Sequence, residues 1–532
     1  MCKKNLVLII NAHQGYIRNI NEKIDFSAEN EILFSAMTDT YIPLLDLFNN
    51  LADDGINYKI GLVLSSTLCS LISDSKIIQQ YENYLENCIS LGENELKRLN
   101  GKPEAKNAEY CLKRLKKIRE SFIVKYHRNL IEQFKSLAQK EYLELIPTAA
   151  TYAYLPHYQD LTEAINAQVE TGLYSQKYFF GEAGEGFYIP YMGWTKGLEK
   201  ILKPYGVNYT IVDPRSLLFS NPKIETGIFC PVRTGNSLAI FAAEPDSEKC
   251  FTGDDGFISN PVYLSVHKDI GFELKDEDLT VLERKNNVRF LTGYRYWCNV
   301  EDEDEYEDAP LYDNEAAQKQ IKEDAEKFVQ AKTEKLNTAK EYLPEDDAVL
   351  VCPLSAELFG QKWFEGIDFL EQVIRIISKE NEIELNTCKN LISNQYTLPK
   401  AELYPCSGDD SGYGEDLLDI TNSWMMRYVK KASERMIDLT ERLPSETSLK
   451  GRMLNLAAKE ILLAQSGEWP AMLHSNQLPE YIKERFKSAI LSFTTIYDSL
   501  ASNSVSTQWL TEKEKEDCLY PWMNYRIFSR KK

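Results

Sequence analysis

The chain has 532 residues, 43% of them hydrophobic and 27% charged, which is typical of a soluble globular protein of two to four domains. A formal net charge of −20 argues against binding to nucleic acid or to anionic membranes. No stretch approaches the roughly 20 apolar residues that a membrane helix requires. The eleven cysteines are dispersed without a Cys-x-x-Cys pair, and this pattern predicts reduced thiols in a cytoplasmic protein.

The first predicted elements alternate between strand and helix. Residues 6–10 form a short apolar run, typical of a parallel strand buried on both faces rather than of an export signal. A helix is expected around 31–51 and a second strand at 58–64. Apolar residues then recur every three or four positions between about 74 and 138, which predicts a helical excursion between strands.

The alternation continues through the middle of the chain. We expect a helix at 316–336 and a solvated acidic loop at 301–308. Further strands are predicted at 143–146, 187–189, 209–212, 291–297 and 348–354. Strands that alternate with helices indicate a parallel barrel, whose active site lies at the carboxyl ends of the strands. His13, Tyr191 and Ser355 fall at those ends.

The character of the sequence changes near residues 406–415. Beyond them almost every segment has a helical pattern: 424–442, 449–463, 479–500 and 511–518. We therefore predict a barrel domain over 1–405 and a helical C-terminal domain over 406–532. Asp409 and Asp410 do not have the spacing of a calcium loop, so a plain loop is expected there.

Two segments resemble the catalytic motifs of glycoside hydrolase family 57. Residues 186–199, Gly-Phe-Tyr-Ile-Pro-Tyr-Met-Gly-Trp-Thr-Lys-Gly-Leu-Glu, resemble the nucleophile motif, Trp-Leu-Pro-Glu-Cys-Gly-Tyr followed by Pro-Gly-Leu-Glu. Residues 353–366, Pro-Leu-Ser-Ala-Glu-Leu-Phe-Gly-Gln-Lys-Trp-Phe-Glu-Gly, resemble the acid/base motif, which contains Asp-Thr/Ala-Glu-Leu-Phe-Gly. In this correspondence the nucleophilic Glu is replaced by Tyr191 and the proton-donating Asp by Ser355.

The resemblance extends over essentially the whole chain and is greatest to α-1,4-glucan branching enzymes and related amylases. It implies an incomplete (β/α)7 barrel followed by an all-α C-terminal domain. It also implies an α-glucan or malto-oligosaccharide as ligand.

Other motif positions depart from the family as well. The first motif keeps one His of two, at His13, and Tyr152 replaces the His of the second motif. Gly467-Glu468-Trp469 stands where the family has Ser-Asp-Trp, and only Tyr413 represents a Trp-rich loop over the groove. The resemblance implies these substrate-binding positions: His13, Tyr152, Trp297, Glu357, Tyr413, Glu468 and Trp469.

Several of these residues also have a purely structural interpretation. His13 is otherwise a hydrogen-bonded histidine of the barrel, and Glu357 otherwise satisfies a buried donor. Trp297 is equally compatible with a sugar-stacking role and with packing. No pairing of the five histidines suggests a metal site, and no cofactor motif is present.

Two functions remain open. The first is an α-glucan-associated homologue of branching enzymes that is catalytically impaired or inactive and acts by glucan binding or regulation, because both catalytic positions and part of the groove have changed. The second is an active branching enzyme, 4-α-glucanotransferase or amylase with relocated groups: Tyr191 with Glu182 or Glu185 as its base, and Glu357 or Glu468 as proton donor. The sequence identifies no protein partner.

Overall fold

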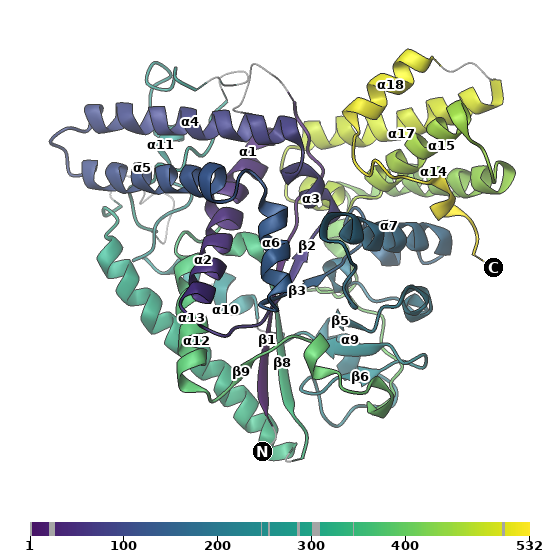
Figure 1. Ribbon diagram of the computed structural model, residues 1–532, viewed down its shortest axis with the longest axis horizontal. Coiled ribbons are helices and arrows are strands. Elements are labelled where there is room, and N and C mark those ends of the chain that lie inside the picture. Colours follow the sequence, from purple (N-terminus) through teal and green to yellow (C-terminus); the bar gives the residue numbers. More distant parts are fainter. Residues whose placement is uncertain are drawn as a thin grey trace.

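Parallel strands lie at the centre of the molecule (Figure 1). The computed structural model describes residues 3–20, 27–245, 247–253, 256–282, 284, 288–300, 309–343, 345–502 and 506–531. The predicted acidic loop at 301–308 lies outside these residues. A five-stranded parallel sheet has the order β3-β2-β1-β8, with β9 also paired to β1. Its strands are β1 (Lys4–Ala12), β2 (Ile60–Leu64), β3 (Leu143–Ile146), β8 (Ala348–Ser355) and β9 (Glu384–Leu385).

A second sheet of four strands has the order β4-β5-β7-β6, with β6 antiparallel to β7. Its strands are β4 (Gly186–Tyr188), β5 (Tyr209–Val212), β6 (Val232–Arg233) and β7 (Ala239–Ala242). Two isolated parallel bridges, Thr148 to Tyr188 and Ala243 to Val351, join it to the first sheet. The carboxyl ends of the parallel strands from both sheets, all except β6, therefore face a common edge.

Helices occupy the connections between the strands. In the first half of the chain they are α1 (Ala28–Ala36), α2 (Ile42–Asp53), α3 (Ser66–Ile72), α4 (Ser75–Arg98), α5 (Ala105–Glu120), α6 (Leu130–Gln139) and α7 (Thr162–Phe180). The next are α8 (Leu198–Leu202), α9 (Pro214–Leu218), α10 (Lys249–Thr252), α11 (Ile270–Glu273), α12 (Asn314–Tyr342) and α13 (Gly366–Glu380). Helices α4, α5 and α6 form the helical excursion that the sequence predicted.

The last part of the described chain is helical, as expected, and packs beside α7 (Figure 1). It contains α14 (Ser423–Arg442), α15 (Ser448–Ala464), α16 (Glu468–His474), α17 (Pro479–Ser502) and α18 (Thr507–Glu516). Hydrogen bonds connect it to the sheet region: Thr151 donates its hydroxyl to the Leu462 carbonyl over 2.6 Å. Gln168 of α7 donates to Gln465 over 2.9 Å.

A π-helical turn, Met37–Tyr41, separates α1 from α2. The sequence pattern predicted one continuous helix here. A π-turn accommodates one extra residue within a helix and frequently occurs at functional sites. The carbonyl of Asp39 contacts Gly360, where an added Cβ atom would lie only 1.8 Å from that oxygen. The turn therefore packs directly against the segment that follows β8.

The strand predicted at 291–297 is wrong. Thr292, Tyr294 and Tyr296 are buried at alternate positions, which produced the strand pattern. At the start of the segment the backbone bonds to a side chain: the amides of Thr292 and Gly293 each donate to Asp269 over 2.9 Å. Further along, Trp297 forms only an isolated bridge with Leu311, so no continuous strand is present.

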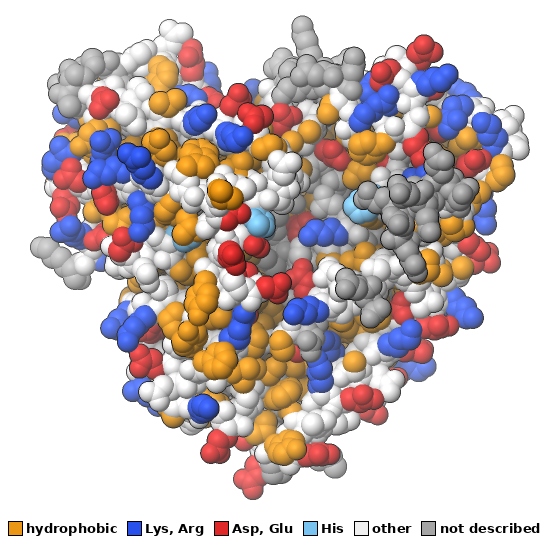
Figure 2. All heavy atoms as spheres, turned by 180° about the vertical axis from the view of Figure 1, so that it is seen from behind, with side chains coloured by type: hydrophobic (Ala, Val, Ile, Leu, Met, Phe, Trp, Pro, Cys, Tyr) orange, Lys and Arg blue, Asp and Glu red, His pale blue; other side chains and the backbone are white. Residues whose placement is uncertain are grey.

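Among the described residues no helix is long and apolar enough to cross a membrane. The ten cysteines that the structure describes are free thiols. Figure 2 shows the reverse face, where acidic and basic side chains lie interspersed rather than in separate fields. Such a surface offers no extended basic stripe on this face for a nucleic acid.

Candidate functional site

Five segments bring polar side chains together at the carboxyl ends of the strands. Asn11 in β1 pairs in register with Ser355 in β8, and His13 follows just beyond β1. Tyr191 stands three residues after β4, and Tyr152 lies in the loop after β3. Glu468, the first residue of α16, comes from the helical C-terminal region. The site thus lies where the two parts of the chain meet.

Glu468 stands between a phenol and an imidazole. Its Oε1 atom lies 3.4 Å from the hydroxyl of Tyr191, which donates to it, and 2.9 Å from Nε2 of His13. The His13 contact has the distance of an ion pair but not the angle of a hydrogen bond. The Glu468 side chain is 24% exposed, so the three groups lie at the edge of solvent.

Charge and burial determine the protonation states of Glu468 and Tyr191. Burial alone raises the pKa of Glu468, but the adjacent His13 and the Tyr191 hydroxyl outweigh it and leave that pKa below its usual value. Burial, together with the Glu468 charge, raises the pKa of Tyr191 well above its usual value. At neutral pH Glu468 is therefore a carboxylate and Tyr191 a neutral phenol.

Tyr152 covers the other side of the histidine. Its ring stacks on that of His13, with centroids 4.0 Å apart and planes 14° apart, and meets Tyr191 edge-on at 5.3 Å. Its hydroxyl accepts a hydrogen bond from the Asn11 amide over 2.6 Å. The backbone φ angles of Tyr152 and Tyr191 are 52° and 55°, left-handed conformations that are rare for residues other than glycine. Backbone strain is thus concentrated at the two aromatic residues of the site.

The chain leaves space for these rings by using glycine. A Cβ atom added at Gly467 would lie 2.4 Å from the Tyr152 carbonyl oxygen and 2.7 Å from the Tyr191 ring. Only glycine fits beside both tyrosines without displacing one of them.

Glu357 is the second carboxylate of the site, and it accepts three hydrogen bonds. The donors are the Ser355 hydroxyl at 2.7 Å, the Tyr41 hydroxyl at 2.5 Å and the His13 backbone amide at 3.3 Å. Glu357 is 8% exposed. His13 therefore lies between the two carboxylates, with its amide on Glu357 and its ring beside Glu468.

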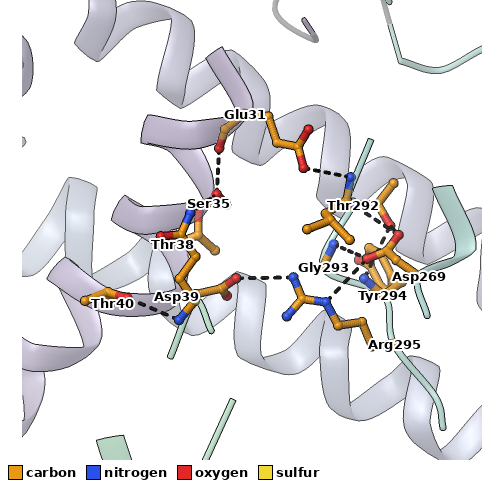
Figure 3. Close-up of polar contacts among 12 residues, drawn as sticks. Glu31, Ser35, Thr38, Asp39, Thr40, Asp269, Thr292, Gly293, Tyr294 and Arg295 are labelled. Carbon is orange, nitrogen blue, oxygen red and sulfur yellow. Dashed lines mark hydrogen bonds and ion pairs between the residues drawn. The ribbon is translucent and has the colours of Figure 1, made fainter. Parts of the chain in front are cut away.

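The π-turn that carries Tyr41 also carries Asp39, which belongs to a buried ionic network (Figure 3). Asp39 lies 2.7 Å from Arg114 and 3.6 Å from Arg295. Arg295 also lies 3.6 Å from Asp269, whose carboxylate organises the 292–294 segment. Glu31 accepts the Leu291 amide over 3.1 Å, and burial raises its pKa to about 7.

The other predicted residues are three aromatic side chains that differ in exposure. Trp469 is buried and donates its indole N–H to the Leu463 carbonyl over 2.6 Å. Trp297 is partly buried, with the Lys268 ammonium 4.5 Å from its ring centroid. Tyr413 is 66% exposed and lies in the loop whose Gly408 amide donates to the Tyr191 carbonyl over 2.8 Å.

The bases suggested for Tyr191 in the alternative mechanism, Glu182 and Glu185, are misplaced for that role. Both line an open cavity of about 590 Å³ at the amino ends of the strands. Glu185 directly precedes β4 and pairs with Lys389 at 2.9 Å, whereas Tyr191 follows β4. Glu468 occupies the position that a base for Tyr191 requires.

Sequence reasoning missed Asn11 and Tyr41 as site residues. Asn11 stands where the family's first motif has its other His, so the resemblance did contain a signal for this position, although Asn11 was not chosen as a site residue. Tyr41 stands in an apolar helical segment, where a tyrosine is interpreted as core. Nothing in the local pattern distinguished Tyr41 from packing.

Parallel strands with a polar cluster at their carboxyl ends, beside a helical C-terminal region, define an α/β fold whose candidate site lies at the strand ends. Residues 7–404 match the glycosyl hydrolase family 57 profile, and residues 428–528 match that of the 1,4-alpha-glucan branching enzyme C-terminal domain. The chain belongs to glycosyl hydrolase family 57.

Individual relatives agree with this membership. A 1,4-alpha-glucan branching enzyme of Thermococcus kodakarensis is 24% identical over 516 residues, covering 91% of this chain and 72% of the relative. The crystal structure of an alpha-amylase from Thermotoga maritima superposes with a TM-score of 0.92 at 28% identity, covering 100% of both chains. A branching enzyme from Pyrococcus horikoshii gives a TM-score of 0.86 at 23% identity, covering 99% of this chain and 97% of that one, and shares the fold.

Proposed function

We propose that this family member is associated with α-glucans through its cleft and has little or no glycosidase activity. One observation carries the proposal: the family's nucleophile position holds Tyr191, a neutral phenol, and its acid/base position holds Ser355, whose hydroxyl donates to Glu357. This correspondence rests on the motif resemblance. The α-glucan association is supported by the names of the branching-enzyme and amylase relatives.

The chemistry explains why these groups are unsuited to hydrolysis. A retaining glycosidase needs one carboxylate to attack the anomeric carbon and one carboxylic acid to protonate the leaving oxygen. A serine hydroxyl is far too weak an acid for that transfer. Glu357 accepts hydrogen bonds from three donors, one of them the Ser355 hydroxyl, so its side chain serves as an acceptor in this arrangement.

Binding does not depend on those groups. Nδ1 of His13 and Oδ1 of Asn11 are buried at the strand ends and have no hydrogen-bonding partner among the described residues. Buried polar atoms normally have partners, so a sugar hydroxyl that reached either atom would satisfy it. The exposed pair Tyr404 and Tyr413, with hydroxyls 3.1 Å apart, offers aromatic surface beside the same loop.

The proposal extends to the architecture and location. We propose that the strands joined by the two bridges form the incomplete (β/α)7 barrel of the family, with a domain boundary near 405/406. The extents of the two matching profiles, 7–404 and 428–528, support this boundary. A cytoplasmic location is supported by the dispersed cysteines of the sequence.

Incubation with amylose or glycogen tests the proposal, with reducing ends and branch points followed over time. We expect turnover far below the enzyme median of about 10 s⁻¹. A rate near that median would overturn the inactive assignment.

Restoring the family's groups provides the complementary test. Tyr191→Glu with Ser355→Asp should create measurable activity if only these groups were lost. A carboxylate at 191 would stand beside Glu468, and two like charges raise one another's pKa. The triple variant with Glu468→Asp, which restores the family's shorter side chain, should therefore be more active than the double variant. The matched control, Glu468→Asp alone, should remain inactive.

A second function is favoured by the contact between Tyr191 and Glu468. In this alternative the Tyr191 oxygen attacks the anomeric carbon, its proton passes to Glu468, and the leaving group departs with the bonding electrons. Glu468 then releases that proton to solvent and takes a proton from the water that attacks the anomeric carbon. The bond from that carbon to the Tyr191 oxygen breaks, and the proton returns from Glu468 to the phenolate. The leaving group must be one that needs no proton, since no proton donor accompanies Ser355.

α-Maltosyl fluoride supplies such a leaving group and separates the two functions. Release of fluoride by the native protein, abolished by Tyr191→Phe and by Glu468→Gln, would establish the second function. Mass spectrometry should then find a maltosyl group on Tyr191. Absence of fluoride release above the spontaneous rate would leave the binding function as the one supported.

A further inference from the structure

Helix α7 presents exposed aromatic rings away from the candidate site. Tyr174 and Tyr178 are 52% and 56% exposed and stand four residues apart, so they share one face of the helix. Tyrosines in a soluble protein are seldom this exposed as a cluster without a binding role.

The indole of Trp522 lies across both tyrosines. Its centroid is 4.2 Å from that of Tyr178 and 5.5 Å from that of Tyr174, with interplanar angles of 35° and 37°. Trp522 comes from the segment after α18, more than 340 residues further along the chain. We call Tyr174, Tyr178 and Trp522 the α7 platform.

The platform is connected to the candidate site through one short loop. Tyr520, two residues before Trp522, is fully buried and donates its hydroxyl to the Ala150 carbonyl over 2.5 Å. The Ala150 amide in turn donates to the Gln168 carbonyl of α7 over 3.0 Å. Tyr152, which stacks on His13, belongs to the same loop. Both the helix and the Trp522 segment are therefore fixed to the loop that carries part of the cleft.

We propose that the α7 platform is a second binding site for an α-1,4-glucan chain, separate from the cleft. This inference rests on the proposed glucan association. Sugar rings present apolar C–H faces that pack on aromatic rings, and tyrosine hydroxyls remain free to hydrogen-bond sugar hydroxyls. A glucan is neutral, so it needs no charged partner from a platform made of aromatic rings. A long glucan chain held here would stay bound to the molecule that carries the cleft, which raises the effective concentration of its free part there.

Fluorine NMR on the full-length protein labelled with 5-fluorotryptophan tests the two sites separately. The chain has seven tryptophans, and Trp522→Phe and Trp297→Phe assign the two informative resonances. Titration with maltoheptaose should move the Trp522 resonance, and Tyr178→Ala should weaken that response about tenfold or more, equivalent to about 1.4 kcal/mol. Tyr178→Phe keeps the ring and should retain most of the response.

Controls separate stacking from damage to the fold. Tyr396→Ala removes a tyrosine that is 68% exposed elsewhere and should leave the Trp522 response unchanged. Retention on native gels containing glycogen should fall for Tyr174→Ala and Tyr178→Ala but not for Tyr396→Ala. Since these tyrosines are exposed, their variants should keep the native unfolding temperature.

Each outcome bears on one of the two proposals. A response at Trp522 without one at Trp297 supports the platform and contradicts a glucan cleft at Trp297. A response at Trp297 without one at Trp522 overturns the platform and leaves the cleft supported. If Tyr178→Ala alters the oligomeric mass in light scattering while maltoheptaose moves neither resonance, the platform is a self-association surface and the inference is wrong.

Discussion

Tyr41 donates its hydroxyl to Glu357 over 2.5 Å, although 316 positions separate the two residues. The bond joins the π-turn between α1 and α2 to the segment after β8. Burial, followed by the Glu357 charge, raises the pKa of Tyr41 well above its usual value, so the phenol remains a donor at every physiological pH. The extra residue of the π-turn thus has an identifiable role: it directs a tyrosine towards the carboxylate that also anchors Ser355 and His13.

Removing this donor should destabilise the site without emptying much volume. Tyr41→Phe leaves Glu357 with one partner fewer in a buried position, which typically costs about 1–3 kcal/mol. Denaturant unfolding measures the loss. The matched control is Tyr428→Phe on α14, where the tyrosine is 50% exposed and little change is expected. Equal stabilities for the two variants would contradict a structural role for the bond.

Gly467 should tolerate no side chain. In Gly467→Ala the new Cβ atom would overlap the Tyr152 carbonyl and the Tyr191 ring, which should cost about 1–3 kcal/mol and move Tyr191 from Glu468. Gly235→Ala is the control, because its nearest neighbouring atom would be 3.6 Å away, an ordinary contact. Thermal unfolding of both variants checks this, and a stable Gly467→Ala would mean that the tyrosines are less tightly packed than described.

Short apolar runs identified much of the sheet from the sequence alone. β1, β3, β5 and β8 were predicted because strands buried on both faces are continuous runs of apolar residues. β7, the four residues Ala239–Ala242, was missed although it is as long as β3 and β5, which were predicted. The strand at 291–297 was predicted wrongly because alternating hydrophobic residues indicate which side chains are buried. They do not indicate whether the backbone pairs with a neighbouring strand.

The site was only partly predictable. The location of His13 and Ser355 at the carboxyl ends of strands could be predicted from the alternation of strands and helices. Glu468 lies 277 positions from Tyr191, and only the family resemblance placed the two near one another. The π-turn has no known sequence signal, so the route from Asp39 and Tyr41 to Glu357 required the structure. Long-range contacts of this kind are set by packing of whole elements rather than by local pattern.

The buried carboxyl of Glu31 makes stability depend on pH. Its pKa of about 7 in the folded protein lies above the usual 4.5, so the folded state holds a proton that the unfolded state has released. Stability therefore falls as pH rises from about 4.5 to 7, and the penalty is fully present above pH 7. Glu31→Gln cannot ionise and keeps an acceptor for the Leu291 amide.

Glu31→Gln should accordingly be more stable than the native protein at pH 8, by a few kcal/mol at most, since one pKa unit is about 1.4 kcal/mol. At pH 4, where the glutamate is protonated in both states, the two proteins should be equally stable. Urea unfolding at both pH values measures the difference. A variant that is destabilised at pH 8 would show that Arg295 and its neighbours need the charge of Glu31.

The last prediction concerns the cleft as a glucan site. Stacking of a sugar on aromatic rings does not require catalytic carboxylates, so binding can occur without catalysis. We expect malto-oligosaccharides to bind with a Kd in the high-micromolar to millimolar range, about −4 to −6 kcal/mol. Calorimetry with maltoheptaose measures this, and Trp297→Ala and Tyr413→Ala should weaken it. Tyr342→Ala, which removes a 79% exposed tyrosine from α12, should not. Undetectable binding at millimolar sugar, or binding that Trp297→Ala leaves unchanged, would mean that the cleft is not a glucan site and that the protein is better viewed as an interaction scaffold.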